Sequence, residues 1–172
     1  MADEQVIEIK NAAGVVVASV RTRGGALLAP QFSKMDLTGA IFDSLVMEGA
    51  SFEFCELKGA SFRGSDLYWA FFCSENLEDA VFDGALLSGV NFAHANLRRS
   101  SFRGAKLTRD NLGGFATFES ADLRGADFRD TELAGNIFAK ARIDDRTQFP
   151  RGFVAEGAWF MPEEISDSSD AD

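Results

Sequence analysis

The chain has 172 residues, of which 46% are hydrophobic and 26% are charged, so it is long enough to bury a substantial core. Two cysteines and one histidine argue against a disulfide scaffold and against a Cys/His zinc site. A net charge of −10 disfavours nonspecific binding to nucleic acid or to an anionic membrane. The sequence has neither an apolar run long enough for a membrane helix nor a recognisable signal peptide, so we expect a cytoplasmic protein.

The N-terminal segment is typical of a β-hairpin. Residues 6–20 contain two β-rich runs on either side of Asn-Ala-Ala-Gly. Residues 22–34 contain Gly24-Gly25 and Pro30, which is typical of a connector. We therefore predict that residues 1–34 form an N-terminal cap.

From Leu37 onward, Leu or Phe recurs at almost every fifth position as far as Leu112. One extra residue follows at Gly113-Gly114, and the period resumes from Phe118 to Ile143. A small residue, most often Ala, stands two positions before most of these. A helix would spread a five-residue period around its whole surface, and a flat strand would place alternate members on opposite faces. The chain must therefore turn once per repeat, always in the same sense, which predicts a solenoid.

The runs LKGASFRGSDL (57–67) and ADLRGADFRDTEL (121–133) resemble the pentapeptide repeat, usually written A-(D/N)-L-x-x. The resemblance covers about residues 35–145. It implies an all-β fold, a right-handed quadrilateral parallel β-solenoid with four repeats per coil and roughly five to six coils. The predicted organisation is a hairpin and connector (1–34), a solenoid (35–146), a short C-terminal cap (147–162) and a disordered acidic tail (163–172).

Stacking each residue on the one 20 positions later gives four core ladders. Face 1 has Phe42, Phe62, Phe82 and Phe102, then Leu123 and Ile143; face 2 has Met47, Leu67, Leu87 and Leu107, then Phe128; face 3 has Phe52, Phe72 and Phe92, then Leu112 and Leu133; face 4 has Leu37, Leu57, Leu77 and Leu97, then Phe118 and Phe138. Phe ladders are thus expected on two opposite faces, with a partial exchange of ladder types at the glycine pair. That slip is either a simple bulge at a corner or a kink that bends the rod.

Outward-pointing charges alternate in sign along two faces, which predicts ion pairs between coils on a solvated surface. The expected columns are Asp43, Arg63, Asp83, Arg103, Arg124 and Asp144 on face 1, and Lys58, Glu78, Arg98 and Glu119 on face 4. Glu75 and Asp110 fall at inward-facing positions. Each is either a catalytic acid or a side chain that reaches water or a backbone NH.

The candidate partner-binding residues are Phe54, Tyr68, Trp69 and Phe71, which point outward on faces 2 and 3. Trp69 is flanked in its column by Gly49 and Gly89, which leaves room for an indole lying along the surface. The alternative is that the N-terminal hairpin folds over these aromatics. At the other end, the apolar residues of the C-terminal cap either plug the last coil or form a dimer seam: Phe149, Phe153, Trp159, Phe160 and Met161.

No catalytic motif, metal-ligand cluster or cofactor-binding loop is present in the sequence, so we expect a non-enzymatic scaffold that binds a protein partner. The resemblance implies an alternative: a DNA mimic that binds DNA gyrase or topoisomerase IV and protects it from quinolones or other poisons. Residues 35–83 carry two cations and ten acids, a net −8, as a DNA mimic requires. The basic residues of 98–109 argue against it: Arg98, Arg99, Arg103, Lys106 and Arg109. We expect no direct nucleic-acid binding, no membrane binding and no cofactor, and either a monomer or an end-to-end homodimer.

Overall fold

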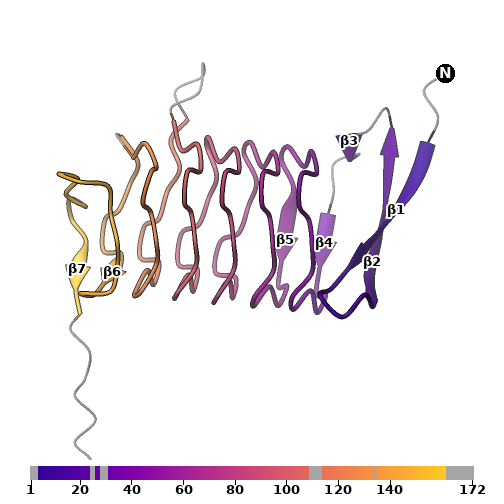
Figure 1. Ribbon diagram of the computed structural model, residues 1–172, viewed down its shortest axis with the longest axis horizontal. Coiled ribbons are helices and arrows are strands. Elements are labelled where there is room, and N and C mark those ends of the chain that lie inside the picture. The colour runs from indigo at the N-terminus through magenta and orange to yellow at the C-terminus, as the bar shows by residue number, and fades with distance from the viewer. Residues whose placement is uncertain (1–3, 24–25, 28–30, 109–113, 134, 162–172) are drawn as a thin grey trace, which may run out of the picture.

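The computed structural model is a rod of stacked coils with a hairpin at one end (Figure 1). It describes residues 4–23, 26–27, 31–108, 114–133 and 135–161. The strands are β1 (Glu4–Lys10), β2 (Val16–Arg23), β3 (Ala26–Leu27), β4 (Gln31–Ser33), β5 (Ser51–Glu53), β6 (Arg142–Ile143) and β7 (Trp159–Phe160). No helix among these described residues is long and apolar enough to cross a membrane.

The hairpin expected over residues 6–20 is present, with β1 and β2 antiparallel and Ile9 opposite Ala18. Its turn is closed by Asn11, whose carbonyl accepts from the Gly14 NH at 2.8 Å. The hairpin continues into the rod, because the Lys10 carbonyl accepts from the NH of Ile41 at 2.8 Å. Figure 1 places β1 and β2 at the end of the stack rather than along its side.

The coils are held by parallel backbone pairing at the spacing of four repeats. Asp36 pairs with Glu56, Glu56 with Asn76, and Asn76 with Asn96. Each five-residue side ends in a β-turn, as where the Ala40 NH donates to the Leu37 carbonyl at 2.9 Å. The third residue of these turns has a positive φ, 63° at Gly39, as a type II turn requires. The repeat is therefore one short strand plus one corner, which explains why its length is five.

The core consists of the predicted Leu and Phe ladders. Phe42 stacks on Phe62 with ring centroids 4.9 Å apart and planes within 4°. Across the core, Phe42 meets Phe52 edge-to-face at 5.6 Å and 85°. Both geometries are favourable for aromatic pairs. The expectation of two opposed Phe ladders is confirmed.

The predicted one-residue slip near Gly113-Gly114 is wrong. Asn91 pairs with Thr117, Asn96 with Asp122, and Ser101 with Asp127, so partners here are 26 residues apart. The spacing is 20 just before this region, at Leu86 and Lys106, and 20 again just after it. Six residues, one whole repeat and one more, are thus inserted between Lys106 and Thr117. Leu112 and Asp110, which the period placed in the core, lie outside the described residues.

The predicted exchange of ladder types is wrong for the same reason. Phe118 stacks on Phe92 at 5.2 Å and Phe138 stacks on Phe118, so both belong to face 3 and not face 4. Phe128 stacks on Phe102 at 4.7 Å on face 1. Leu123 pairs with the coil of Leu97, which places Leu123 and Ile143 on face 4 instead of face 1. By the same offset, Leu133 follows Leu107 on face 2.

Pairing extends past both predicted borders of the solenoid. At the N-terminal side, β4 pairs in parallel with β5, and Phe32 stacks on Phe52 at 4.8 Å. At the C-terminal side, Gln148 pairs with Asp127 and Phe149 stacks on Phe128 at 5.4 Å. The Phe ladders therefore run without a break from Phe32 to Phe149.

Candidate functional site

Tyr68, Trp69 and Phe71, which we call the aromatic corner, lie where face 2 turns into face 3. Tyr68 is the last outward residue of face 2, Trp69 is the turn residue with φ of 55°, and Phe71 is the first outward residue of face 3. The side chain of Trp69 is 40% exposed and that of Phe71 is 47% exposed. Phe54 is 76% exposed and lies at the other corner of face 3. The described part of the hairpin leaves Phe54, Trp69 and Phe71 exposed, while Tyr68 is half-buried.

The indole of Trp69 has a fixed position because it lies on a glycine of the next coil. A Cβ atom added to Gly89 would be 2.9 Å from Cε2 and Nε1 of Trp69. Only glycine therefore allows the ring to lie flat along the corner. Tyr68 packs edge-on against it, with ring centroids 6.3 Å apart. These contacts restrict the rotamers of both rings, which reduces the entropy cost of binding a partner.

A shallow pocket lies on each side of Trp69. The one on face 3 has a volume of about 370 Å³ and includes Glu53, Phe71, Cys73 and Glu75 in its lining. The one on face 2 has a volume of about 350 Å³, and its lining includes Asp66, Tyr68, Leu86 and Lys106. Each pocket combines an aromatic ring with carboxylates, so the surface has both apolar and polar contacts to offer.

Glu75 occupies a position where most repeats have a small residue, and it is only 7% exposed. Its carboxylate accepts from the backbone NH of Phe54 at 2.9 Å and from that of Cys55 at 2.8 Å. At most other corners the NH corresponding to Phe54 donates to a carbonyl of the next coil, as Gly49 donates to Tyr68. The Glu75 side chain thus replaces a missing backbone hydrogen bond. This confirms the expectation that it reaches a backbone NH.

Burial raises the pKa of the Glu75 carboxyl above its ordinary value, although the two NH donors act in the opposite direction. Burial also raises the pKa of the neighbouring Cys55 thiol. Cys73, on the same face, is the exposed thiol of the two. Because both oxygens of Glu75 are engaged by the backbone, the carboxylate is committed to holding a corner.

Asn136 uses the same device where the sequence again lacks a small residue. Its Oδ1 accepts from the Ala116 NH at 3.0 Å, and its Nδ2 donates to the Leu107 carbonyl at 3.1 Å. These two bonds join the chain segments on either side of the six-residue insertion. In the sequence, Asn136 shows only that the residue two positions before Phe138 is not small.

The charge column of face 1 is a structural feature, as predicted for its first members. Asp43 accepts from the Arg63 NH at 3.0 Å, and Arg63 lies 3.9 Å from Asp83. Arg103 pairs with Asp127 at 3.7 Å. The predicted continuation through Arg124 and Asp144 is wrong, because the insertion moves both to face 4.

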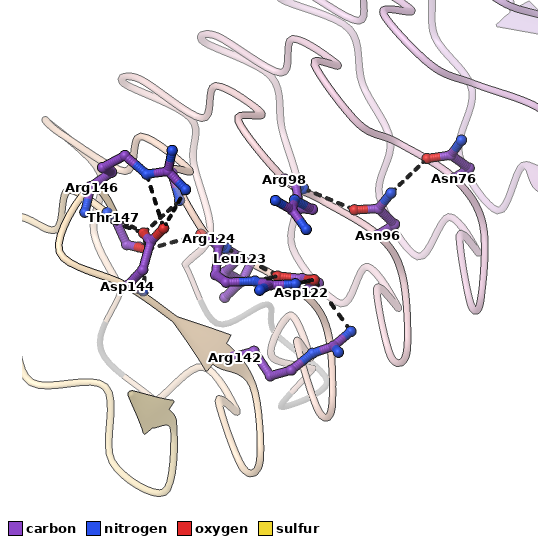
Figure 2. Close-up of polar contacts among 11 residues, drawn as sticks. Asn76, Asn96, Arg98, Asp122, Leu123, Arg124, Arg142, Asp144, Arg146 and Thr147 are labelled. Carbon is purple, nitrogen blue, oxygen red and sulfur yellow. Dashed lines mark hydrogen bonds and ion pairs between the residues drawn. The ribbon is translucent and has the colours of Figure 1, made fainter. Parts of the chain in front are cut away.

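Face 4 consequently carries more arginines than the sequence predicted. Arg98, Arg124 and Arg142, which we call the arginine face, come from three successive coils (Figure 2). The predicted column on this face is correct for Lys58 and Glu78, which lie 3.6 Å apart. Glu119 is on face 3, since its carbonyl accepts from the His94 NH.

The C-terminal apolar residues divide into two groups. Phe149 and Phe153 pack on the last core rings, with Phe153 5.6 Å from Phe138. Trp159 and Phe160 of β7 are 54% and 59% exposed. The plug expected for this segment is thus built by the first group, while the second group stays on the surface.

Comparison with known proteins agrees with this architecture. A family model described as pentapeptide repeats, in 8 copies, matches residues 31–72, 76–114 and 115–145. No curated protein matches the chain.

Similar solved structures include two pentapeptide repeat proteins and one fluoroquinolone resistance protein. A pentapeptide repeat protein from the thylakoid lumen of Arabidopsis thaliana is 28% identical, with a TM-score of 0.42 over 61% of this chain and 70% of that chain. Rfr23 from the cyanobacterium Cyanothece 51142 is 18% identical, with a TM-score of 0.33 over 69% and 90%. Full-length QnrB1, a plasmid-mediated fluoroquinolone resistance protein, is 15% identical, with a TM-score of 0.31 over 76% and 82%. On the family match and its repeats, the chain belongs to the pentapeptide repeat family.

Proposed function

We propose that this protein is a non-enzymatic, cytoplasmic scaffold that binds a protein partner through the aromatic corner. The observation that carries the proposal is Trp69, an indole held flat over Gly89 while 40% of its surface remains exposed. Aromatic side chains that are packed in place yet partly exposed supply much of the binding energy of protein interfaces. Phe71, and Phe54 at the far edge of face 3, extend the apolar contact area.

The remaining surface supports the same assignment. On face 1 the charges are paired between coils, so that face has little left for a partner. Glu75, the buried carboxylate with the raised pKa, is engaged by two backbone NH groups and is assigned no catalytic role. We assign the protein no cofactor.

The proposal is tested by affinity capture from lysate of the native host. The wild-type protein is compared with a Trp69→Ala/Phe71→Ala double variant and with Ile137→Ala as the matched control. Ile137 is 46% exposed and lies in the same column of face 3 as Phe71. We expect one partner to be retained by the wild type and by the control and to be lost from the double variant. A partner retained equally by all three proteins would refute the role of the corner.

The alternative function is mimicry of DNA toward a type II topoisomerase, which rests on the net −8 charge of residues 35–83. The arginine face argues against it, because a DNA mimic needs continuous negative charge along the rod. A gyrase supercoiling assay separates the two functions. Inhibition or quinolone protection that depends on Asp66 and Glu56 but not on Trp69 would favour the mimic.

The oligomeric state is a separate proposal. Trp159 and Phe160 are exposed at the C-terminal end of the rod, which supports an end-to-end homodimer rather than a monomer. Sedimentation of the wild type and of Trp159→Ala distinguishes the two states. A wild type that sediments as a monomer at all concentrations would exclude the dimer.

A further inference from the structure

The arginine face contains more positive charge than its own carboxylates neutralise. Asp122 accepts from Arg124 through Nε at 2.9 Å and through Nη2 at 2.6 Å, and it lies 3.3 Å from Nη2 of Arg142 (Figure 2). The guanidinium of Arg98 contacts no carboxylate in the part of the chain that the structure describes. Arg124 and Arg142 thus share one aspartate, and Arg98 contacts none of the described carboxylates, so the three arginines and Asp122 together carry a net charge of +2.

The neighbouring acidic groups are already engaged elsewhere. Asp144 accepts from Nε of Arg146 at 3.0 Å and from Nη2 at 2.8 Å, and it also accepts from Thr147. Burial opposes the ionisation of Asp122, but hydrogen bonds from Arg124 and the charge of Arg142 hold its pKa below the ordinary value. Asp122 is therefore an anion in the folded protein. Glu78, one coil before Arg98 in the same column, pairs with Arg99 and Lys58 instead. Among the described residues, Arg98 thus pairs with no carboxylate and Arg142 pairs with Asp122 alone.

The C-terminal segment starts beside this surface. In the parallel pair of β6 and β7, Arg142 lies opposite Trp159, and the Met161 NH donates to the Ile143 carbonyl at 2.7 Å. The residues that follow contain five acids and no cation: Glu163, Glu164, Asp167, Asp170 and Asp172. Arg142 and Arg98 are two coils apart, about 10 Å at the usual strand spacing. Six residues of extended chain reach about 20 Å, so the segment is long enough to cover the whole arginine face.

We propose that residues 162–172 bind back along face 4, with their carboxylates on Arg142 and Arg98. The charges are complementary, five negative against two uncompensated positive. A tethered segment has an effective concentration in the millimolar range, which favours it over a separate acidic protein that binds through the same chemistry. The arginine face is then occupied by the protein's own acidic segment and is shielded from other anions.

The test compares the full-length protein with a full-length variant whose five tail acids are replaced: E163Q, E164Q, D167N, D170N and D172N. The arginine Nε–Hε signals are recorded by NMR. We expect the signals of Arg98 and Arg142 to differ between the two proteins and to converge at about 500 mM NaCl, where surface charges are screened. The signals of Arg63 and Arg103 on face 1 serve as the internal control and should coincide.

A second measurement uses a labelled synthetic peptide of residues 161–172. It should bind the tail-neutral variant at least about fivefold more tightly than the wild type, whose own tail competes. Arg98→Gln in the tail-neutral background should weaken this binding about fivefold, and Arg63→Gln should leave it unchanged. Identical Arg98 and Arg142 signals in the two proteins would overturn the proposal. Equal peptide binding by the two proteins would also overturn the proposal, because it would show that the protein's own tail does not compete for the arginine face.

Discussion

Replacing Phe82 by Ala tests whether the stacked Phe ladders stabilise the rod. Phe82 is fully buried, and it stacks on Phe62 and on Phe102 with ring centroids 5.0 Å away on each side. It also meets Phe72 and Phe92 edge-to-face at 5.7 and 5.3 Å. The substitution therefore removes four ring contacts and leaves a cavity between three coils.

The expected loss in the free energy of unfolding is about 3–5 kcal/mol, the usual cost of Phe→Ala in a core. The four ring contacts place the loss for Phe82→Ala toward the upper end of this range, because each aromatic pair adds about 0.5–1.5 kcal/mol beyond the contribution of the buried area. The free energy of unfolding of a domain is about 5–15 kcal/mol, so the variant should still fold but should lose a large part of this free energy.

Urea unfolding followed by far-UV circular dichroism measures this loss. With a slope of about 2 kcal/mol per M, the midpoint should fall by about 1.5–2.5 M. Phe71→Ala is the control, since that ring is 47% exposed and its removal should change the stability by no more than about 0.5 kcal/mol. Equal effects of the two substitutions would refute the claim that the ladder stabilises the rod.

Three further predictions concern polar groups and the insertion. Glu75→Gln should cost about 1–3 kcal/mol, because an amide can accept from only one of the NH groups of Phe54 and Cys55. Glu75→Ala should cost at least as much, because it removes both side-chain acceptors; a higher urea midpoint for the Ala variant than for the Gln variant would contradict this. The pKa of Asp122 is lowered in the folded state, so its stabilisation is present above the unfolded pKa of about 3.9 and is lost as the pH falls through the folded pKa. Asp122→Asn should therefore destabilise the protein at pH 7 and make unfolding less sensitive to acid, and an unchanged pH profile would count against it. Excision of residues 109–114 should change stability by less than about 1 kcal/mol, since it restores the regular spacing between Asn91 and Thr117; a drop of many degrees in the thermal midpoint would contradict this.

The repeat pattern determines the architecture because it is enforced at every coil. A buried Leu or Phe and a corner follow each other every five residues. A single residue that departs from the pattern therefore does not change the fold, because the neighbouring repeats specify it. The corner residue with positive φ also explains the glycines at positions such as 39 and 89. A solenoid was therefore predictable from the residues alone, and the two opposed Phe ladders were predictable once the family resemblance supplied four repeats per coil.

The register across the insertion was not predictable in this way. One extra residue and one extra residue plus a whole repeat shift the five-residue period by the same amount, and Leu112 continues that period in the sequence. Only backbone pairing, as between Asn96 and Asp122, distinguishes the two. The arginine face depends on this register, which is why the sequence assigned Arg124 to the wrong face. By contrast, the space for the Trp69 indole over Gly89 was predictable from the sequence. Its exposure was not, because the sequence left open whether the hairpin covers it.

The most direct test of the proposed function uses Cys73, the exposed thiol that lines the pocket beside Phe71. A benzophenone attached to Cys73 is photolysed in host lysate, and cross-linked products are identified by mass spectrometry. We expect one dominant cross-linked protein, whose yield falls at least about tenfold with Trp69→Ala and is unaffected by Ile137→Ala. A cross-linking pattern that is the same with and without the Trp69 indole would contradict the claim that the aromatic corner is the docking surface.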